Sequence, residues 1–260
     1  MRDATARTEA ERVAGARRWF RVQGREPIEA GGVTVVATPA YPATWEANFV
    51  MPGPGVGGEA ALAALEKHAP AGWQVVQVDC LTAPDVEAVL ALEGFAVANS
   101  LIEMVAKAVA PVPPAPRVAV ERVGAGAWDR FAALVEADHR EGKRTGDYDP
   151  AVAAGLLAGM RGRSACDHWL LVEDGVDLGY GMTALCPNGL GLIENLFTLP
   201  AHRGRGVMSR FIGAAAARLR AAGCDAVFLD AHADDTPKRL YAKLGFRAVA
   251  VTRTWVRKVG

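Results

Sequence analysis

The sequence has few cysteines, no long apolar run and no excess of charge of either sign. Its cysteines are scattered and include no C-x-x-C pair: Cys80, Cys166, Cys186 and Cys224. This pattern indicates neither a disulfide framework nor a cysteine-ligated metal, so we expect no metal and a reducing, cytoplasmic setting. No stretch approaches the ~20 apolar residues that span a membrane. The net charge is zero, which gives no support to a nucleic-acid or membrane partner.

The composition is that of a folded, soluble protein. Hydrophobic residues make up 51% of the 260 residues and charged residues 22%, which is enough for one large or two ordinary domains. Residues 1–20 are rich in arginine but contain Asp3, Glu9 and Glu11 and no apolar core. We therefore expect a surface helix there and not a targeting peptide.

A proline-rich segment divides the chain. Four prolines fall within residues 109–118, VAPVPPAPRV. Proline fixes φ and lacks an N–H group, so this segment can continue neither a helix nor an interior strand, and it is typical of a stiff linker. The expected domains are residues 1–110 and 117–260.

The expected second domain combines helical and strand patterns. Apolar residues recur at helical spacing over 127–140 and 149–162, where Asp149 is a candidate N-cap and Pro150 lies in the first turn. Residues 168–199 predict three strands, with a hairpin turn at EDGVD. The rest predicts a helix ended by Gly223, a strand at 226–231, a helix at 236–246 capped by Thr236, and a strand at 247–258. The expected fold class is α+β, a mixed and mostly antiparallel sheet flanked by helices.

The stretch TLPAHRGRGVMSRF, residues 198–211, joins an expected strand to an expected helix through two glycines. Glycines at a helix start let an anion approach N–H groups that lack intrahelical partners, and the helix dipole favours negative charge there. Arg203 and Arg205 add positive charge. The spacing fits neither the dinucleotide fingerprint nor the Walker loop, so we expect a phosphate-binding turn of another kind.

Three segments within residues 117–260 resemble the GNAT superfamily of acyl-CoA-dependent N-acyltransferases and follow its order. HRGRGV is similar to the family's Arg/Gln-x-x-Gly-x-Gly/Ala loop, with Arg203 and Gly206 in place. LGYGMTA ahead of IENLFTLPAHR resembles the strand pair that leads into this loop, and LYAKLGF resembles the tyrosine-containing helix with its Gly-Phe ending. The resemblance implies a GNAT-like fold and acyl transfer from acyl-CoA.

The resemblance also implies where acetyl-CoA, the expected cosubstrate, binds. Main-chain amides of the loop would hold the pyrophosphate, and the strand before the loop, which splays from its neighbour in the family, would pair with the pantetheine. The implied cofactor-binding residues are Phe197, Thr198, Leu199, Arg203, Gly204, Arg205, Gly206, Val207, Met208, Ser209 and Asp234. Met208 stands where the family prefers Gly or Ala, and Asp234 where it often has Asn.

One residue is the candidate acid, and two are candidates for the base. By the resemblance, Tyr241 would stand beside the sulfur and protonate the departing thiolate as general acid; its ordinary pKa of ~10 keeps it protonated at neutral pH. An attacking amine must lose a proton, and Glu194 is our first candidate for that base because an acid in an otherwise apolar strand needs a reason. The alternative is that Glu194 lies at a bulge or a solvated strand end. Asp230 is a second candidate, which could instead cap a strand end.

The acceptor side is expected around residues 136–149, EADHREGKRTGDYD. Asp138, His139 and Tyr148 are the candidate acceptor-binding residues, against the alternative of an ordinary solvated loop. His202 and His232 lack a second ligand at metal-site spacing and are read as surface or capping histidines.

The first domain repeats the order of elements of the second. NFVMPGPGVGGEAALAAL parallels NLFTLPAHRGRGVMSRFI, which suggests two tandem GNAT-like halves. The first copy lacks the chemistry, because Gly55 and Gly57 replace the arginines and Leu90 falls at the tyrosine position. Glu59 places a carboxylate where a pyrophosphate would bind. We expect the first half to be structural or to shape the acceptor cleft.

Together these features predict an N-acyltransferase that moves an acetyl or other short acyl group from acyl-CoA to a small-molecule amine or amino-acid-like acceptor. The amine would attack the thioester directly in a ternary complex, since no cysteine lies in the motifs to form an acyl-enzyme. Two alternatives stay open: a non-catalytic module that senses acyl-CoA, and an acyltransferase that uses aminoacyl-tRNA, with the N-terminal arginines contacting RNA. The sequence does not predict the acceptor or the oligomeric state.

Overall fold

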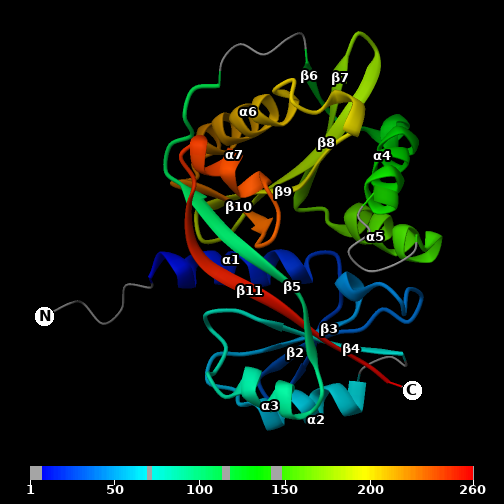
Figure 1. The fold of residues 1–260 in the computed structure, drawn as a ribbon, viewed down its shortest axis with the longest axis vertical. Helices are drawn as coiled ribbons and strands as arrows, with labels where there is room; N and C mark the ends of the chain where they lie inside the picture. The colour runs from blue at the N-terminus through cyan, green and yellow to red at the C-terminus, as the bar shows by residue number, and fades with distance from the viewer. Residues whose placement is uncertain (1–7, 69–71, 113–117, 142–147, 260) are drawn as a thin grey trace, which may run out of the picture.

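The structure, a computed structural model, describes residues 8–68, 72–112, 118–141 and 148–259 (Figure 1). Its strands form one sheet in the order β1-β2-β3-β4-β11-β5-β10-β9-β8-β7-β6. The strands are β1 (Ile28–Ala30), β2 (Val33–Val36), β3 (Phe49–Pro52), β4 (Trp73–Val78), β5 (Ala96–Ala106), β6 (Ala119–Arg122), β7 (Cys166–Glu173), β8 (Val176–Leu185), β9 (Leu190–Thr198), β10 (Ala226–His232) and β11 (Arg247–Lys258). The helices are α1 (Glu9–Val22), α2 (Gly58–His68), α3 (Val86–Leu92), α4 (Trp128–Glu141), α5 (Pro150–Gly162), α6 (Val207–Ala221) and α7 (Pro237–Lys243).

The sheet is mixed and mostly antiparallel, as predicted. Among the described strand pairs, β3 with β4 and β9 with β10 are parallel. Each parallel pair is a strand, a glycine-containing loop, a helix and a second strand, so the repeated order of elements predicted for the two halves is present. The other pairs, such as β5 with β10, are antiparallel.

The two halves exchange their last strands. β11, the end of the chain, lies between β4 and β5 of the first half, and β5 in turn pairs with β10 of the second half. Figure 1 shows β5 and β11 running side by side from the upper part of the molecule into the lower part. The sheet of the first half is therefore complete only when the C-terminal strand is in place.

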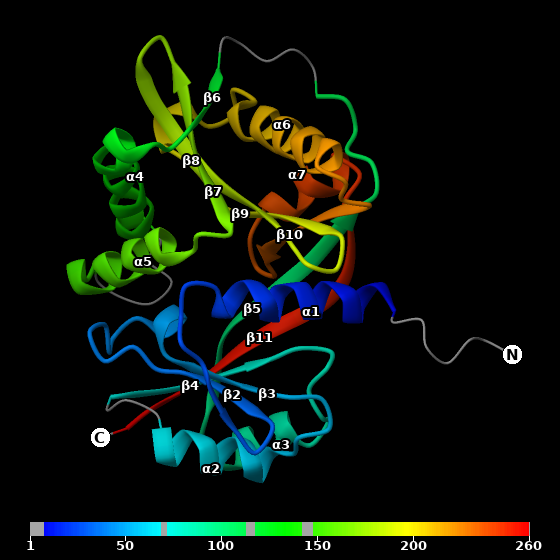
Figure 2. The same ribbon diagram turned by 180° about the vertical axis from the view of Figure 1, so that it is seen from behind.

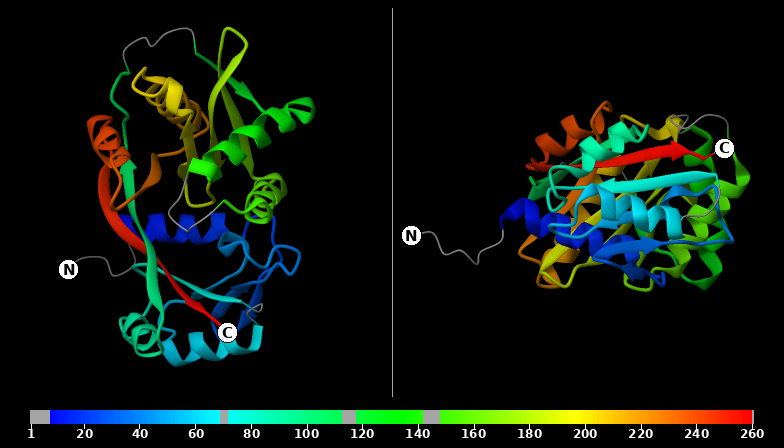
Figure 3. Two further views of the ribbon diagram at one scale, coloured as in Figure 1. Left: turned by 45° about the vertical axis from the view of Figure 1, so that its right-hand side comes forward. Right: turned by 90° about the horizontal axis from the view of Figure 1, so that it is seen from below.

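Helices cover both faces of the sheet. In the upper part, α6 and α7 pack on one face, and α1, α4 and α5 pack on the other (Figure 2). Side chains along each strand alternate between these two cores, as the period of two requires. Phe228 of β10 lies in the core with α1, α4 and α5, and the next residue, Leu229, lies in the core with α6 and α7. In the lower part, α2 and α3 pack on one face (Figure 3).

The N-terminal helix is not the surface helix that the sequence predicted. It begins with a capping box, in which the Thr8 side chain and Glu11 bond each other's main-chain N–H groups. Its residues Val13, Ala16 and Phe20 are buried between the upper and lower parts, and Figure 1 shows α1 crossing between them. The surface prediction was wrong because Arg17 and Arg18 of this helix have carboxylate partners inside the molecule.

Most local signals were read correctly. The Asp149 side chain accepts from the Ala151 N–H at the start of α5, and the β7–β8 turn carries Asp174 at φ 50° and Gly175 at φ 79°, as a two-residue hairpin requires. Gly245 follows α7 at φ 95°. Thr236 precedes α7 but its side chain makes no cap hydrogen bond, so that part of the prediction was wrong.

Among the described helices, none is long and apolar enough to cross a membrane.

The strand exchange predicts that the first half does not fold alone. Expressed as residues 1–112, the chain has no β11 to join β4 to β5, and the edges of both strands stay unpaired. We expect this fragment to give a poorly dispersed amide NMR spectrum and to become ordered when coexpressed with residues 113–260. A well-dispersed spectrum of the isolated fragment would contradict the dependence.

Candidate functional site

The parallel strands β9 and β10 separate part-way along their length. They pair at Leu190–Leu192 of β9 and Ala226–Phe228 of β10, and no further pairing joins them in the described chain. Beyond this point β9 continues beside β8, and β10 continues beside β5. The sheet therefore opens between β9 and β10, as the family resemblance implied.

A bulge in β9 lies at the opening. Met182 of β8 pairs with Glu194, whereas Tyr180, two residues earlier, pairs with Phe197, three residues later. The extra residue is accommodated at Asn195, which has φ 52°, a conformation that Asn tolerates better than most side chains. Glu194 thus faces α1 and Phe197 faces the same core, although an unbulged strand would put them on opposite faces.

Three carboxylates lie side by side on the face of the sheet that α1 covers. Asp230 of β10 is the direct cross-strand partner of Glu103 of β5. Glu194 and Asp230 each lie two residues beyond the last paired residues of β9 and β10, so they flank the opening. Like charges on neighbouring strands repel, and this arrangement requires a cation.

Arg17 of α1 supplies that cation. Its guanidinium donates to both oxygens of Glu103 at 2.9 Å, to Glu194 Oε2 at 2.5 Å, and lies 2.8 Å from Asp230. The side chain of Arg17 is 3% exposed and that of Glu103 is 1% exposed, whereas Glu194 and Asp230 are 16% and 17% exposed. Glu103 is therefore an internal anchor, and Glu194 and Asp230 are the carboxylates that a ligand can reach.

The surroundings change the pKa of two groups at the opening. Burial, with a smaller contribution from the charge of Glu194, raises the pKa of Asp230 to about 8. Burial, followed by the charges of Asp230 and Glu194, raises the pKa of Tyr241 well above its ordinary value. Asp230 therefore belongs to the candidate site and does not cap a strand end, which was the alternative left open by the sequence. Tyr241 keeps its proton at neutral pH.

The loop before α6 presents free main-chain donors. Gly204 and Gly206 have φ of 73° and 77°, and the main-chain N–H groups of residues 204–209 donate to no group in the described part of the chain. A Cβ on Gly204 would meet nothing within 4 Å, so the loop is open to its surroundings. These donors at the start of a helix fit the pyrophosphate of acetyl-CoA by charge and geometry.

Both loop arginines have partners in this structure. Arg203 donates to the Thr198 carbonyl at 2.9 Å and pairs with Glu141 of α4 at 2.5 Å. Arg205 pairs with Glu173 and contacts His202 Nδ1 at 3.0 Å. All of these side chains except Glu173 are exposed or half-exposed, so these surface pairs are weak and can exchange for a ligand.

The other residues predicted for the cofactor lie around the same opening. The Leu199 N–H donates to the Leu178 carbonyl, so this donor is already used, whereas the buried Thr198 hydroxyl has no partner in the described residues. Phe197 and Val207 are buried. Met208 and Ser209 lie in the first turn of α6, and the Met208 side chain packs against the core. Asp234 lies in the exposed turn between β10 and α7.

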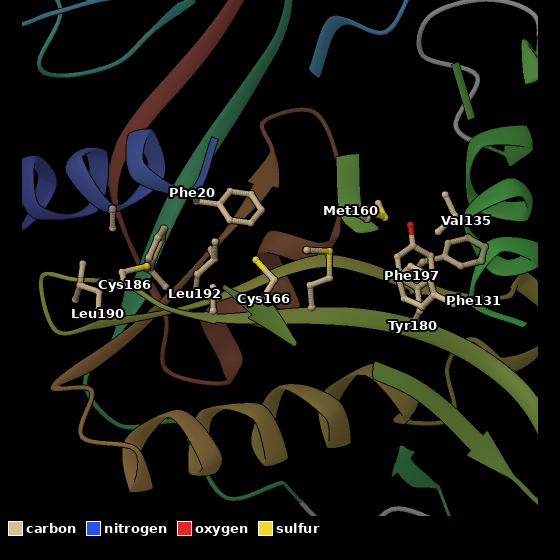
Figure 4. Packing of buried hydrophobic residues seen from close by; sticks show 14 of the residues in the cluster. Phe20, Phe131, Val135, Met160, Cys166, Tyr180, Cys186, Leu190, Leu192 and Phe197 are labelled. Carbon is tan, nitrogen blue, oxygen red and sulfur yellow. The ribbon is translucent and has the colours of Figure 1, made fainter. Parts of the chain in front are cut away.

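The residues predicted for the acceptor split into two groups. Asp138 of α4 accepts from the Tyr180 hydroxyl at 2.6 Å, and burial raises the pKa of Asp138. Tyr180 packs against Phe197 at 5.8 Å between ring centres, and Figure 4 shows these rings together with Phe131. His139 and Tyr148 instead face each other at 5.6 Å, nearer the surface. Residues 142–147 of the predicted acceptor loop lie outside the described residues.

The first half has lost its phosphate site by a different route from the one predicted. Glu59 is exposed in the first turn of α2. The carboxylate at the start of α2 comes instead from Asp85, which precedes α3. Asp85 accepts a hydrogen bond from the Gly58 N–H at 3.0 Å. A carboxylate of the chain itself occupies this helix terminus, so the prediction for Glu59 is corrected to Asp85.

The comparisons with known proteins agree with this geometry. Residues 128–246 match the model of the acetyltransferase (GNAT) family. A GNAT acetyltransferase domain therefore occupies this part of the chain. The family implies acyl transfer from acetyl-CoA. No curated protein matches the sequence.

Solved structures share the fold over most of the chain. A GCN5-related N-acetyltransferase from Kribbella flavida is 17% identical, covers 98% of each chain and has a TM-score of 0.67. A functionally unknown conserved protein from Staphylococcus epidermidis is 13% identical, with 90% of this chain and 94% of that one covered and a TM-score of 0.67. A tandem GNAT protein from the clavulanic acid biosynthesis pathway is 17% identical, with 78% and 68% covered and a TM-score of 0.52. These structures confirm a GNAT-like fold, and one of them is described as a tandem protein.

Sequence reasoning missed Arg17, although it identified Glu194. The only signal was an arginine among the apolar residues of an amphipathic helix, in AGARRWF. Its partners come from β5, β9 and β10, which no local pattern connects to α1.

Gly204 provides a test of the phosphate-binding loop in the GNAT domain. Gly204→Ala and Gly204→Glu share the same strain at positive φ, and neither Cβ meets another atom, so they differ in charge and side-chain length. We expect the Glu variant to bind acetyl-CoA at least ~10-fold more weakly than the Ala variant in calorimetric titration, because a carboxylate repels the pyrophosphate. Equal affinities would show that the loop does not hold phosphate.

Asp230 predicts a specific dependence of stability on pH. Its pKa is about 8 in the folded protein and ~3.9 when unfolded, so the folded state binds more protons between these values. The free energy of unfolding should therefore fall as pH rises from about 4 to about 8. In Asp230→Asn this fall should be shallower, as measured by urea denaturation across that range. The exposed Asp225→Asn is the control; parallel curves for wild type and Asp230→Asn would refute the assignment.

Proposed function

We propose that this protein is an acyl-CoA-dependent N-acetyltransferase that transfers an acetyl or other short acyl group to the amine of a small, amino-acid-like molecule. The observation that carries the proposal is the opening between β9 and β10. It has two reachable carboxylates on its arms, the free amides of the α6 loop on one side and Tyr241 beside it. Acetyl-CoA, when bound, supplies the activated acyl group.

Glu194 is the proposed group that takes the amine proton. One of its oxygens, Oε2, accepts from Arg17, and the other, Oε1, has no hydrogen-bond partner in the described residues. An amine at the opening can therefore donate to Oε1 while Arg17 holds the carboxylate in place. Asp230 faces Glu194 across the opening, and after burial the charge of Glu194 is the largest cause of the raised pKa of Asp230.

Tyr241 is the proposed acid. As the amine nitrogen bonds to the carbonyl carbon and the carbon–sulfur bond breaks, the sulfur gains negative charge. Because burial raises the pKa of Tyr241 above its ordinary value of ~10, its hydroxyl is a weaker acid than a thiol, whose pKa is ~8.5. Tyr241 therefore acts first by donating a hydrogen bond to the departing sulfur, and it passes the proton only as the bond breaks.

We place the acceptor on the face of the sheet covered by α1, α4 and α5. Glu194, Asp230 and Tyr180 face this side, and Asp138 reaches it through its bond to Tyr180. The proposal includes a small-molecule acceptor, a cytoplasmic setting, and neither a nucleic-acid nor a membrane partner.

Tyr241→Phe tests the proposed chemistry. Removing the hydroxyl should lower kcat by about 10²-fold, the usual size of an acid–base contribution, with acetyl-CoA affinity changed less than ~2-fold. Thiol release during an amine screen measures the rate, and calorimetry measures binding. Tyr41→Phe, in the first half, is the matched control. Binding of acetyl-CoA without transfer to any amine, in wild type as in Tyr241→Phe, would favour a sensing module instead.

A further inference from the structure

A cluster of arginines lies where α1 meets α5, close to the catalytic opening. Arg163 ends α5, and Arg25 follows α1 after the turn at Gly24. The two segments touch, because a Cβ on Gly24 would lie 2.3 Å from the Gly162 carbonyl oxygen. Arg21 lies on α1 one turn after Arg17. Three cations thus share one interface between the halves.

The buried Arg163 and the half-buried Arg25 lack the anionic partners that such guanidinium groups normally have. Arg163 is 8% exposed, and its Nε has no hydrogen-bond partner in the described chain; the buried Nε of Arg25 also has none. The side chains of Arg163, Arg25 and Arg21 form no hydrogen bond or ion pair with the described residues. Arg163 only stacks on the Phe20 ring, at 4.4 Å. A buried cation without an anion is costly and requires an explanation.

The charges around the cluster compensate it only in part. Burial, followed by the charge of Arg163, lowers the pKa of Arg25 to about 10, and Glu46 of the first half acts in the opposite direction without reaching ion-pair distance. Burial also lowers the pKa of Arg163. The charge of Arg17 lowers this pKa too, whereas the charges of Glu194 and Glu46 raise it. The cluster stays positively charged at neutral pH, and an external anion would compensate this charge.

The cluster and the opening lie on the same face of the molecule. Arg163 and Glu194 are near enough for the charge of one to act on the pKa of the other. Phe20, on which Arg163 stacks, also contacts the Arg17 guanidinium at 5.9 Å, and Figure 4 shows Phe20 pointing from α1 toward the sheet. A small molecule with its amine at Glu194 can therefore extend toward Arg163.

We propose that Arg163 and Arg25 bind an anionic group of the acceptor, so that the acceptor is an amine that also carries a carboxylate, as an amino acid does. This inference rests on the proposed function and names its substrate class. Carboxylates at the opening receive the ammonium end, and guanidinium groups at the interface receive the anionic end. A phosphate or sulfonate would satisfy the same donors, and the experiment separates these sources.

The test compares acids with their amides. L-Amino acids, the corresponding L-amino acid amides, phosphoethanolamine and taurine are offered with acetyl-CoA, and kcat/KM is measured for each. We expect at least one amino acid to exceed its amide by about 10- to 100-fold, the usual value of a hydrogen bond to a charged partner. A preference for phosphoethanolamine or taurine over every amino acid, or amides that equal the acids, would overturn the proposal.

Arg163→Met and Arg25→Gln identify the residues. Each should abolish the preference for the acid and leave kcat/KM for the amide unchanged. Arg161→Met is the matched control, since Arg161 lies on the same helix, is exposed and packs on Trp128. An unchanged preference in both Arg163→Met and Arg25→Gln would overturn the assignment.

Stability gives a second readout. Because Arg163 has no internal anion, Arg163→Met should keep or raise the Tm without ligand, as its apolar stem is retained. A clear fall in Tm would indicate a structural role and contradict the proposal.

Ligand binding separates this proposal from the proposed function. Thermal-shift titration with the same amino acids and amides, without acetyl-CoA, reports the anion site directly in wild type and Arg163→Met. Absence of acetyl-CoA binding or of acetyl transfer would refute the proposed function alone. Absence of an acid-dependent shift in wild type would refute the anion site alone.

Discussion

The ion cluster around Arg17 holds the centre of the molecule together. One guanidinium compensates carboxylates on three adjacent strands, one of which, β5, belongs to the first half, while β9 and β10 belong to the second. Removing one partner of a buried pair commonly costs about 3–5 kcal/mol, because the other charge stays buried. The same contact therefore fixes the position of α1, joins the halves and sets the geometry of the opening. Thr252 of β11 adds a hydrogen bond to Glu103 at 3.1 Å, which brings the exchanged strand into the network.

This contact also explains why a half without its own phosphate site is retained. Asp85 occupies the helix terminus that would bind phosphate, and Leu90 is fully buried where the second half has Tyr241. The first half nevertheless contributes α1, with Arg17, and receives β11. Its role in our interpretation is to complete the sheet and to form one wall of the acceptor side. The sequence-based expectation that it shapes the acceptor cleft stays a prediction.

The features that sequence reasoning predicted are those set by local rules. The hairpin at Asp174–Gly175 and the N-cap at Asp149 each depend on a few neighbouring residues, so their patterns are visible in the chain. The loop before α6 is also local, because glycines and a following helix suffice to define it. Glu194 could be selected as an acid in an apolar strand, and the structure shows that it lies at the bulge and beside a cation at once.

The remaining features depend on contacts between distant segments. The exchange of β5 and β11 is set by pairing across more than a hundred residues, and both strands have the alternating pattern of an ordinary edge or central strand. The burial of Arg17 depends on three carboxylates that are far apart in the sequence. Asp230 could be read as a strand cap, because its cross-strand partner Glu103 was not predictable from its neighbours.

The distribution of charge on the acceptor side is the last constraint on function. Hydrogen-bonded carboxylates at the opening are compensated by Arg17, whereas Arg163 and Arg25 at the interface are not. If stability alone had shaped this interface, an apolar side chain in place of Arg163 would pack against Phe20 at lower cost. The stacking on Phe20 leaves the charge of Arg163 without an anionic partner in the described residues, and a bound anion would supply one. Under our proposal, the positive site and the carboxylates on one face would select a ligand with separated charges over a simple amine or a simple acid.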